Sequence, residues 1–456
     1  MADESSFSTN NESPVSAESG PPTGARAALT ASPHEQAFYG ATEPPVFPET
    51  YDELAEIVLQ AQDEGRTLVP SGTGSHAYIG LPPASEPLIV SLRKLDQIVR
   101  YEPDDFTIGA QAGTPVNKLR EALAENRQEI PVDVSTRSAS TLGGWLAVNP
   151  SSARQTRYGL LRNYLIGLHG LRGGRPPQKF KSGSMVVKNV AGYEAGKFLL
   201  GSLGTAGFIV EANFKLRPLP AHRSLSVTQF STRRAAWTFV RAFHDLRLEP
   251  AILQVLAGEA ASSLHQKVKL LNPQAHAVIW QFEGNESLVT WQNNEIEKLL
   301  CEHESVAAEA VPAEAIPDVT DFTCEFSEPP AIPPSDLVIL RLGDLPKRLR
   351  EFETALFGLL EAETTRFSAL SDALSGLLTL RLHGSNSGSL LAQIRELVQS
   401  RRATGTLLYL SPTERSACPY YHFVPNAAFG PIDSIRHVFD PEAIFIADRV
   451  FGREKS

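Results

Sequence analysis

The stretch Lys188–Pro220, KNVAGYEAGKFLLGSLGTAGFIVEANFKLRPLP, places five glycines around a helix-like and a strand-like segment. It closes a window between Asp133 and Glu194 that contains no other Asp or Glu. The cations of this window are Arg137, Arg154, Arg157, Arg162, Arg172, Arg175, Lys179, Lys181 and Lys188. In a chain of net charge −10, such a window is either a solvated basic face or a surface that meets an anion. The glycine spacing favours the anion site, because glycines let backbone N–H groups approach a ligand closely.

Length and composition indicate a soluble globular protein with more than one core. A chain of 456 residues predicts two or three domains. Its acidic balance argues against a general nucleic-acid-binding protein. Cys301, Cys324 and Cys418 lie far apart and form neither a CxxC pair nor an iron–sulfur spacing, so we expect reduced thiols.

Nothing in the sequence resembles a membrane span or a secretion signal. No apolar run reaches the roughly 18 residues that a membrane helix needs. The N-terminus lacks a basic segment followed by an apolar one. We therefore expect a cytoplasmic protein without an integral membrane segment, which could still dock at the inner membrane through partners.

Four segments are expected along the chain. Residues 1–45 are rich in Ser, Pro, Glu and Gly, and predict a disordered tail. Residues 46–220 alternate strand and helix patterns, which predicts an α+β or α/β domain. Residues 221–430 form a second domain with longer helical patterns, and 431–456 form a short C-terminal piece. No clear internal repeat is visible.

Details of the second domain follow from local composition. The Pro- and acid-rich stretch Val311–Ser335 predicts a linker or a long surface loop. Trp237, Trp280 and Trp291 are expected to pack in the core of this domain.

The segment Gly72–Ala77 fits the loose dinucleotide pattern G-x-G-x-x-A. A Rossmann site would need a helix opening directly from this loop, and the Gly and Pro residues of Tyr78–Pro83 argue against one. The loop can still bind a pyrophosphate through bare backbone amides, with hydroxyl donors from Ser71, Thr73 and Ser75. The alternative is an ordinary tight turn. Ser140–Gly144 is a second loop of this kind.

Several motifs occur in an order that resembles a known family. They are Pro70–Ser75, Ala112–Thr114, Thr141–Gly144, Tyr158–Gly159, Lys188–Glu194, Gly201–Ile209 and the C-terminal Phe439–Phe445. Together they resemble the PCMH-type FAD-binding domain of the vanillyl-alcohol-oxidase superfamily, and most of all the FAD-binding E subunit of glycolate oxidase. The likeness covers roughly residues 45–220 and weakens over 221–430. Thr73 stands where the family usually has a third glycine, and Ile446–Arg449 replaces its Asn-Pro-Gly-Arg.

The resemblance implies an α+β fold: a two-subdomain PCMH-type FAD-binding domain at 46–220 and an α+β cap domain with an antiparallel sheet at 221–430. The segment 431–456 would return to the FAD-binding domain. The implied cofactor-binding residues are Ser71, Gly72, Thr73, Gly74, Ser75, His76, Thr141, Gly143, Gly144, Tyr158, Gly159, Asn189, Gly204, Ile209 and Val210. Some relatives attach FAD covalently through a histidine near His76, but here the histidine is displaced by one position, so we expect noncovalent FAD.

The resemblance also implies a function, an FAD-dependent oxidation of a small hydroxy acid. Such a reaction needs a hydride acceptor, a base for the hydroxyl proton and a cation for the carboxylate. Lys188 and Tyr193 are expected near the flavin ring. The alternatives for the base are Tyr158, His383, Tyr421 and His422, and the available cations are Arg154, Arg157 and Arg162. His169 is expected to be a hydrogen-bonded core residue.

The implied partners are a second flavin subunit and an iron–sulfur subunit, since this chain has no cluster ligands of its own. The metal motif of the related D subunit is absent, so no metal is expected. Two alternatives stay open: a noncatalytic FAD-binding subunit that relays electrons or assists assembly, and a stand-alone flavin dehydrogenase of another alcohol or hydroxy acid.

Overall fold

A computed structural model describes residues 31–185, 195–269, 276–303, 305–330, 333–384, 387–411, 422–423, 430–446 and 448–451. Up to residue 220 the helices are α1 (Pro33–Tyr39), α2 (Tyr51–Asp63), α3 (Val116–Glu125), α4 (Leu142–Val148), α5 (Gln155–Tyr158), α6 (Leu161–Tyr164) and the 3-10 helix η1 (Ala195–Leu199). The strands are β1 (Leu68–Ser71), β2 (Leu88–Ser91), β3 (Ile98–Glu102), β4 (Thr107–Gln111), β5 (Gln128–Glu129), β6 (Leu165–Arg172), β7 (Gln178–Gly183), β8 (Phe208–Lys215) and β9 (Arg217–Pro218).

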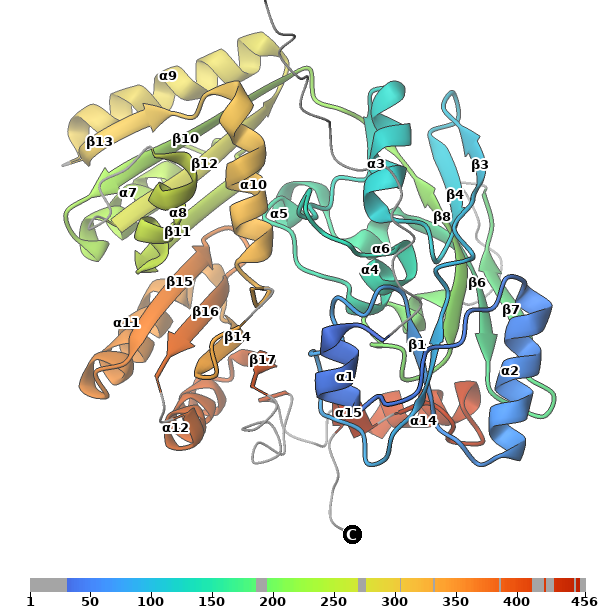
Figure 1. Cartoon of the computed structure of the whole chain (residues 1–456). Helices are drawn as coiled ribbons and strands as arrows, with labels where there is room; N and C mark the ends of the chain where they lie inside the picture. The colour runs from blue at the N-terminus through green and yellow to red at the C-terminus, as the bar shows by residue number, and fades with distance from the viewer. Residues whose placement is uncertain are drawn as a thin grey trace, which may run out of the picture. The chain divides into compact units, whose positions relative to one another are not determined.

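Two sheets organise this first part of the chain (Figure 1). Strands β1 and β2 form a parallel pair. Helix α2 begins after Thr50, whose hydroxyl accepts a hydrogen bond from the backbone N–H of Glu53. The other sheet has five antiparallel strands in the order β3-β4-β8-β6-β7. The C-terminal segment returns to the β1–β2 pair, since Phe445 forms an isolated parallel β-bridge with Leu68 of β1.

The rest of the chain builds one antiparallel sheet of eight strands, which we call the cap sheet. Its strands are β10 (His222–Phe230), β11 (Ile252–Gly258), β12 (His276–Gly284), β13 (Ser305–Ala310), β14 (Leu337–Gly343), β15 (Arg366–Asp372), β16 (Leu377–His383) and β17 (Thr404–Leu410). The helices are α7 (Arg233–Asp245), α8 (Ala260–Val268), α9 (Glu286–Glu302), η2 (Ala313–Ala315), α10 (Ile316–Glu325), α11 (Pro346–Ala362), α12 (Ser387–Ser400), α14 (Gly430–Phe439) and α15 (Asp448–Phe451). The expected α+β fold with an antiparallel cap sheet is confirmed.

The cap sheet contains a repeat that the sequence does not show. Its strand order is β13-β10-β12-β11-β15-β16-β14-β17. Each half therefore places its first strand between its fourth and its third, and β11 pairs with β15 to join the halves. The second half has β-α-β-β-α-β topology, and the first half adds α8 between its second and third strands. Two copies of one topology need not share a recognisable sequence, because only the pattern of apolar residues has to repeat.

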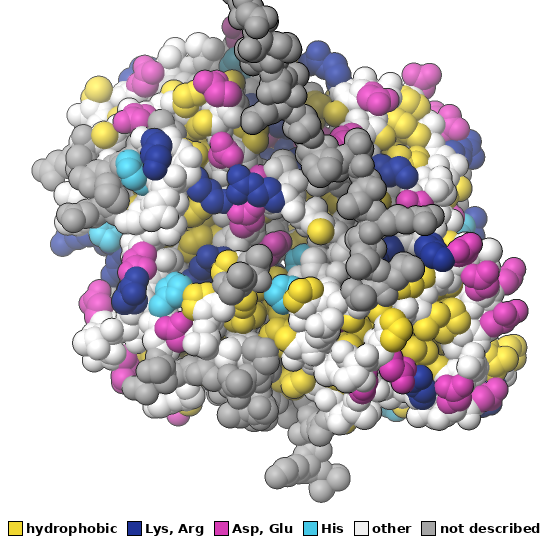
Figure 2. All heavy atoms as spheres, in the orientation of Figure 1, with side chains coloured by type: hydrophobic (Ala, Val, Ile, Leu, Met, Phe, Trp, Pro, Cys, Tyr) yellow, Lys and Arg dark blue, Asp and Glu magenta, His cyan; other side chains and the backbone are white. Residues whose placement is uncertain are grey.

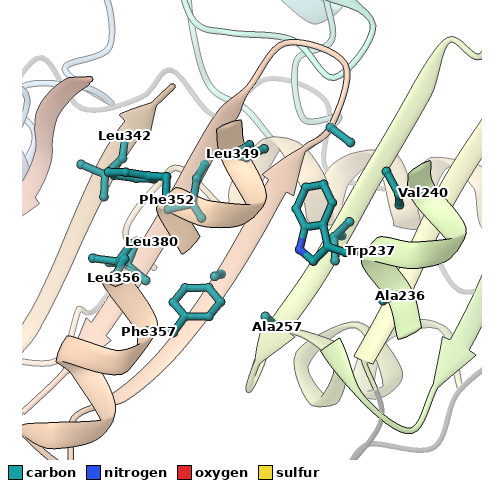
Figure 3. Packing of buried hydrophobic residues seen from close by; sticks show 14 of the residues in the cluster. Ala236, Trp237, Val240, Ala257, Leu342, Leu349, Phe352, Leu356, Phe357 and Leu380 are labelled. Atoms are coloured by element: carbon teal, nitrogen blue, oxygen red, sulfur yellow. The ribbon is translucent and has the colours of Figure 1, made fainter. Parts of the chain in front are cut away.

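Helices α7, α9, α11 and α12 cover one face of this sheet. Figure 3 shows Trp237 of α7 and Phe352, Leu356 and Phe357 of α11 lying against sheet residues such as Leu380. The predictions for Trp237 and Trp280 are confirmed, whereas that for Trp291 is wrong, because its side chain is 52% exposed on α9.

Glu353 of α11 is a charged group within this core. It accepts a hydrogen bond from Trp237 Nε1 at 2.7 Å and another from the Ser371 hydroxyl. Burial raises the pKa of Glu353 to about 7. Because the folded protein holds this proton more tightly than the unfolded chain, the stability contributed by this group falls as pH rises from about 4.5 to about 7.

We therefore expect Glu353→Gln to raise the unfolding free energy at pH 8 by roughly 3 kcal/mol, at 1.36 kcal/mol per pKa unit, and to change it little at pH 4.5. Urea unfolding at the two pH values measures this difference. Glu351→Gln, at an exposed position of the same helix, is the control and should stay within about 0.5 kcal/mol of wild type at both. An equal effect of Glu353→Gln at both pH values would contradict the assignment.

Two segments expected to be irregular contain helices. The predicted tail includes α1, where Phe38 and Tyr39 are buried, although residues 1–30 lie outside the described part. The predicted linker Val311–Ser335 includes α10, with Val319, Phe322 and Phe326 buried against the second face of the cap sheet. Both predictions are wrong because tertiary contacts, and not local propensity, order these segments.

Candidate functional site

The loop Ser71–His76 follows β1 and exposes its backbone. Gly74 has φ of +70°, and a Cβ atom added at Gly72 would lie 2.1 Å from Thr141 Oγ1. Thr141 in turn caps α4, where its hydroxyl accepts from the N–H of Gly144 at 3.3 Å. The described residues 72–87 form turns and bends without a helix, so the Rossmann alternative is not supported.

The two predicted loops and the glycine-rich stretch meet around one space, which we call the glycine-lined groove. It is open to solvent on one side, and the space between its walls, including that opening, is about 750 Å³. The predicted residues that line it are Ser71, Gly72, Thr73, Gly74, Ser75, His76, Thr141, Gly143, Gly144, Gly204 and Ile209. The structure therefore brings together residues from three segments that are far apart in the sequence.

Other predicted residues lie elsewhere. The Tyr158 hydroxyl donates to the Glu283 carboxylate of the cap sheet, and neither Tyr158 nor Gly159 lines the groove. Val210 is buried next to the groove, where its carbonyl accepts from the N–H of Ala112 at 2.8 Å. Lys188, Asn189 and Tyr193 lie outside the described residues.

Three groups at the groove were missed by sequence reasoning. Tyr39 of α1 and Arg449 of α15 line it. Glu35 of α1 is buried and accepts a hydrogen bond from the Ser71 hydroxyl at 2.5 Å. The Ser32–Glu35 capping box just before Phe38 and Tyr39 was the one signal that could have indicated an ordered α1.

The groove suits a dinucleotide that carries phosphates. At Gly72 and Gly143 an added Cβ would lie within 3.0 Å of Thr141 or Ala112, so only glycine leaves the backbone open there. The Ser71 and Thr73 hydroxyls of the loop already donate to Glu35 and to the Ala139 carbonyl, so the backbone N–H groups and the buried Arg449 are the groups that suit a phosphate.

Comparison with known proteins identifies this region. Residues 44–172 match the family described as FAD binding domain. The chain contains a PCMH-type FAD-binding domain. The groove residues described above would therefore hold FAD, with the loop Ser71–Ser75 as the candidate pyrophosphate loop.

Several curated relatives share this domain. The chain is 27% identical to glycolate oxidase subunit GlcD of Bacillus subtilis over 46% of its own length and 44% of the relative. It is 30% identical to D-2-hydroxyglutarate dehydrogenase of Xanthomonas citri over 44% and 43%, and 30% identical to glycolate oxidase subunit GlcE of Escherichia coli over 40% and 53%. The chain thus spans about half the length of the curated relatives it matches.

A solved structure of alkyldihydroxyacetonephosphate synthase shares the fold more widely. The TM-score is 0.62 with 15% identity, over 89% of this chain and 77% of that protein. The similarity therefore extends beyond the FAD-binding domain to the cap sheet.

The basic window is not one anion-binding surface. Arg154 is buried against Glu129, Asp133 and Glu283, at 3.1, 2.8 and 3.4 Å. Other cations of the window pair with carboxylates from outside it: Arg137 with Asp318, Arg157 with Glu249, Arg175 with Asp63, and Lys179 with Asp52. Figure 2 shows basic and acidic side chains interspersed over the visible face. Distant segments supply the acids that the window lacks.

Part of the second face of the cap sheet, over β14–β16, carries polar side chains that line a small pocket shared with the FAD-binding domain. Arg341, Asp372 and Thr379 line it from the sheet, and Ser151 and Ser152 line it from the segment after α4. Burial raises the pKa of Asp372 to about 6, although hydrogen bonds from Ser375 and Leu374 oppose this rise.

A larger cavity of about 2330 Å³ adjoins the phosphate loop, since Thr73 and Ser75 line both it and the glycine-lined groove. His383 of β16 lines this cavity, and burial lowers its pKa, which keeps the ring neutral near pH 7. His76 contacts Glu328 at 3.4 Å on the same side.

The remaining predicted histidines have structural contacts. His422 bonds Thr406 at 3.2 Å, and burial lowers its pKa to about 4. His169 of β6 lies 3.5 Å from Glu211 of β8, but its side chain is 26% exposed, so the prediction of a hydrogen-bonded core residue is wrong. Among the described residues no group of three or more His, Cys, Asp or Glu could hold a metal ion, and none of the described helices is long and apolar enough to cross a bilayer.

Proposed function

We propose that this chain is an FAD-dependent oxidoreductase that oxidises the CH–OH group of a small hydroxy acid. The glycine-lined groove beside a polar cap face is the observation that carries this proposal. The relatives named as glycolate oxidase subunits and as D-2-hydroxyglutarate dehydrogenase support the reaction class. FAD, when bound, supplies the hydride acceptor.

The cap face supplies the groups that such a substrate requires. Arg381 of β16 lines the same cavity as His383 and offers a guanidinium for a carboxylate. We propose His383 as the base for the substrate hydroxyl, because its ring lines the cavity that adjoins the phosphate loop and is neutral near pH 7. Lys188 and Tyr193 stay proposed as groups near the flavin ring. Tyr158 is less suited to act as the base, because its hydroxyl already donates a hydrogen bond to the Glu283 carboxylate.

We further propose that the chain works as one subunit, with a second flavin subunit and an iron–sulfur subunit as partners. Two relatives are themselves named as glycolate oxidase subunits, which supports this arrangement. The noncatalytic relay subunit is the second candidate function, and the same two relatives, being parts of an assembly, favour it.

Anaerobic titration of the purified yellow protein tests these proposals. We expect glycolate, D-lactate or D-2-hydroxyglutarate to bleach the flavin absorbance. If the protein cannot be loaded with FAD, the oxidoreductase proposal is wrong. If FAD-loaded protein is bleached by none of these hydroxy acids, the noncatalytic relay subunit is the function that remains.

The base is tested by His383→Gln. We expect flavin reduction to slow by about 100-fold or more while the affinity for FAD is unchanged, since a positioned base contributes about 10²–10⁴-fold. His437→Gln is the matched control, because His437 is exposed on α14 and bonds only its own helix. A His383→Gln protein that is reduced at the wild-type rate would exclude His383 as the base.

A further inference from the structure

Arg449 is a buried cation on the wall of the glycine-lined groove. Its residue exposure is 4%, and it comes from the C-terminal α15 rather than from the predicted loops. It stands where the resembling family has the arginine of Asn-Pro-Gly-Arg, but the three residues before it differ.

The polar contacts of the Arg449 guanidinium are all with neutral groups. Nη1 donates to the Leu203 carbonyl at 3.1 Å, and Nη2 donates to the carbonyls of Ala77, at 3.1 Å, and Ile79. The Tyr39 ring lies 5.0 Å from the guanidinium carbon. Nε is buried and has no hydrogen-bond partner.

The contrast with Arg154 shows what Arg449 lacks. Arg154 is 7% exposed and pairs with three carboxylates. In the described part of the chain no Asp or Glu forms an ion pair with Arg449, which is equally buried. A buried charge without a counter-ion is unfavourable, so an anion entering this groove gains a partner that the protein itself does not provide.

The carbonyls that Arg449 contacts belong to both walls of the groove. Ala77 follows the phosphate loop, and Leu203 belongs to the glycine-rich stretch. The side chain thus lies where the two walls meet, with its charge in the same space as the Ser71–Ser75 loop.

We propose that Arg449 is a cofactor-binding residue that supplies the positive charge for the diphosphate of the dinucleotide. This inference rests on the groove being the FAD site. The C-terminal segment is then part of the cofactor site, and the charge of Arg449 is neutralised only when the cofactor is bound.

Fluorescence titration of the apoprotein with FAD, and with riboflavin as the ligand without phosphates, tests this role. We expect Arg449→Met to raise the Kd for FAD about 10- to 100-fold, the range for a lost hydrogen bond to a charged group, and to leave the Kd for riboflavin nearly unchanged. Arg449→Lys keeps the charge and should recover most of the affinity. The salt dependence of FAD binding should be flatter in Arg449→Met than in wild type.

Arg436→Met is the matched control, because Arg436 lies in the same C-terminal segment, pairs with Asp433 at 2.9 Å and lines none of these cavities. Thermal melts of each apoprotein separate loss of fold from loss of binding. Unchanged FAD affinity and salt dependence in Arg449→Met would overturn the proposal, as would an equal loss for FAD and riboflavin with no recovery in Arg449→Lys. Wild-type protein that does not bind FAD would instead overturn the proposed function itself.

Discussion

Gly72→Val is expected to abolish FAD binding and to give a colourless protein. The added side chain would start 2.1 Å from Thr141 Oγ1 and 3.0 Å from Thr141 Cβ, and Thr141 is itself buried at the start of α4. The loop and α4 would have to separate, and both line the glycine-lined groove. Overpacking at such a contact lowers the stability of the fold by about 1–3 kcal/mol, and at Gly72 the displaced residues are those that line the groove. Flavin absorbance of the purified protein and titration of the apoprotein with FAD measure the outcome.

A second glycine separates this effect from the general cost of replacing glycine. Gly358 lies within α11, and a Cβ atom added there has no neighbour within 4 Å. Gly358→Ala should keep full FAD content and gain up to about 1 kcal/mol of stability, since alanine favours a helix interior. Wild-type FAD affinity in Gly72→Val would contradict the assignment of this loop to the cofactor.

Arg154→Met is expected to lower the unfolding free energy by about 3–5 kcal/mol, because it leaves the buried Asp133 without its ion-pair partner. Glu129 and Glu283 each lose one partner and keep Arg223. Asp133 and Glu283 have side-chain exposures of 7% and 0%. Burial alone would raise the pKa of Asp133, but the Arg154 guanidinium and the Ser152 hydroxyl hold it below its usual value. In wild type this pairing stabilises the fold above about pH 4 and is lost as pH falls through the lowered pKa.

The pH dependence of this variant gives a further check. Without Arg154 the buried carboxylates hold protons more tightly than in the unfolded chain, so the deficit should shrink on acidification from pH 8 to pH 5. Urea unfolding at both pH values measures it. Arg366→Met is the control, because its pair with Glu259 is exposed and such surface pairs contribute little to stability. A loss in Arg154→Met no larger than in this control would refute the role of the buried pairs.

The loops of the glycine-lined groove could be predicted because their chemistry is local. Gly72–Ala77 and Ser140–Gly144 combine glycines with hydroxyl residues, and these requirements are met within a few positions of the chain. The order of the motifs then identified the domain that the family comparison confirms. Tyr158 could not be placed in this way, because its hydroxyl is held by Glu283 from a distant strand.

The charges of the basic window show why a local count was insufficient. Arg175 and Lys179 pair with Asp63 and Asp52 of the α2 region, and Arg157 pairs with Glu249 from the second half of the fold. Charge along a sequence does not reveal charge in space, since each carboxylate approaches only when the chain has folded.

The sequence by itself determined the mixed helix-and-strand class and the loops that line the groove, because glycine spacing and apolar periodicity act over a few residues. The antiparallel cap sheet was implied only by the resemblance to a known family. Only the tertiary structure decided that α1 and α10 are helices, that Tyr39 and Arg449 join the groove, and that the cap is a doubled topology. The Phe38 ring packs edge-on against the Tyr409 ring, and the Arg449 guanidinium donates hydrogen bonds to the carbonyls of Ala77 and Leu203. Burial against residues remote in the chain is the physical reason, and no local pattern encodes it.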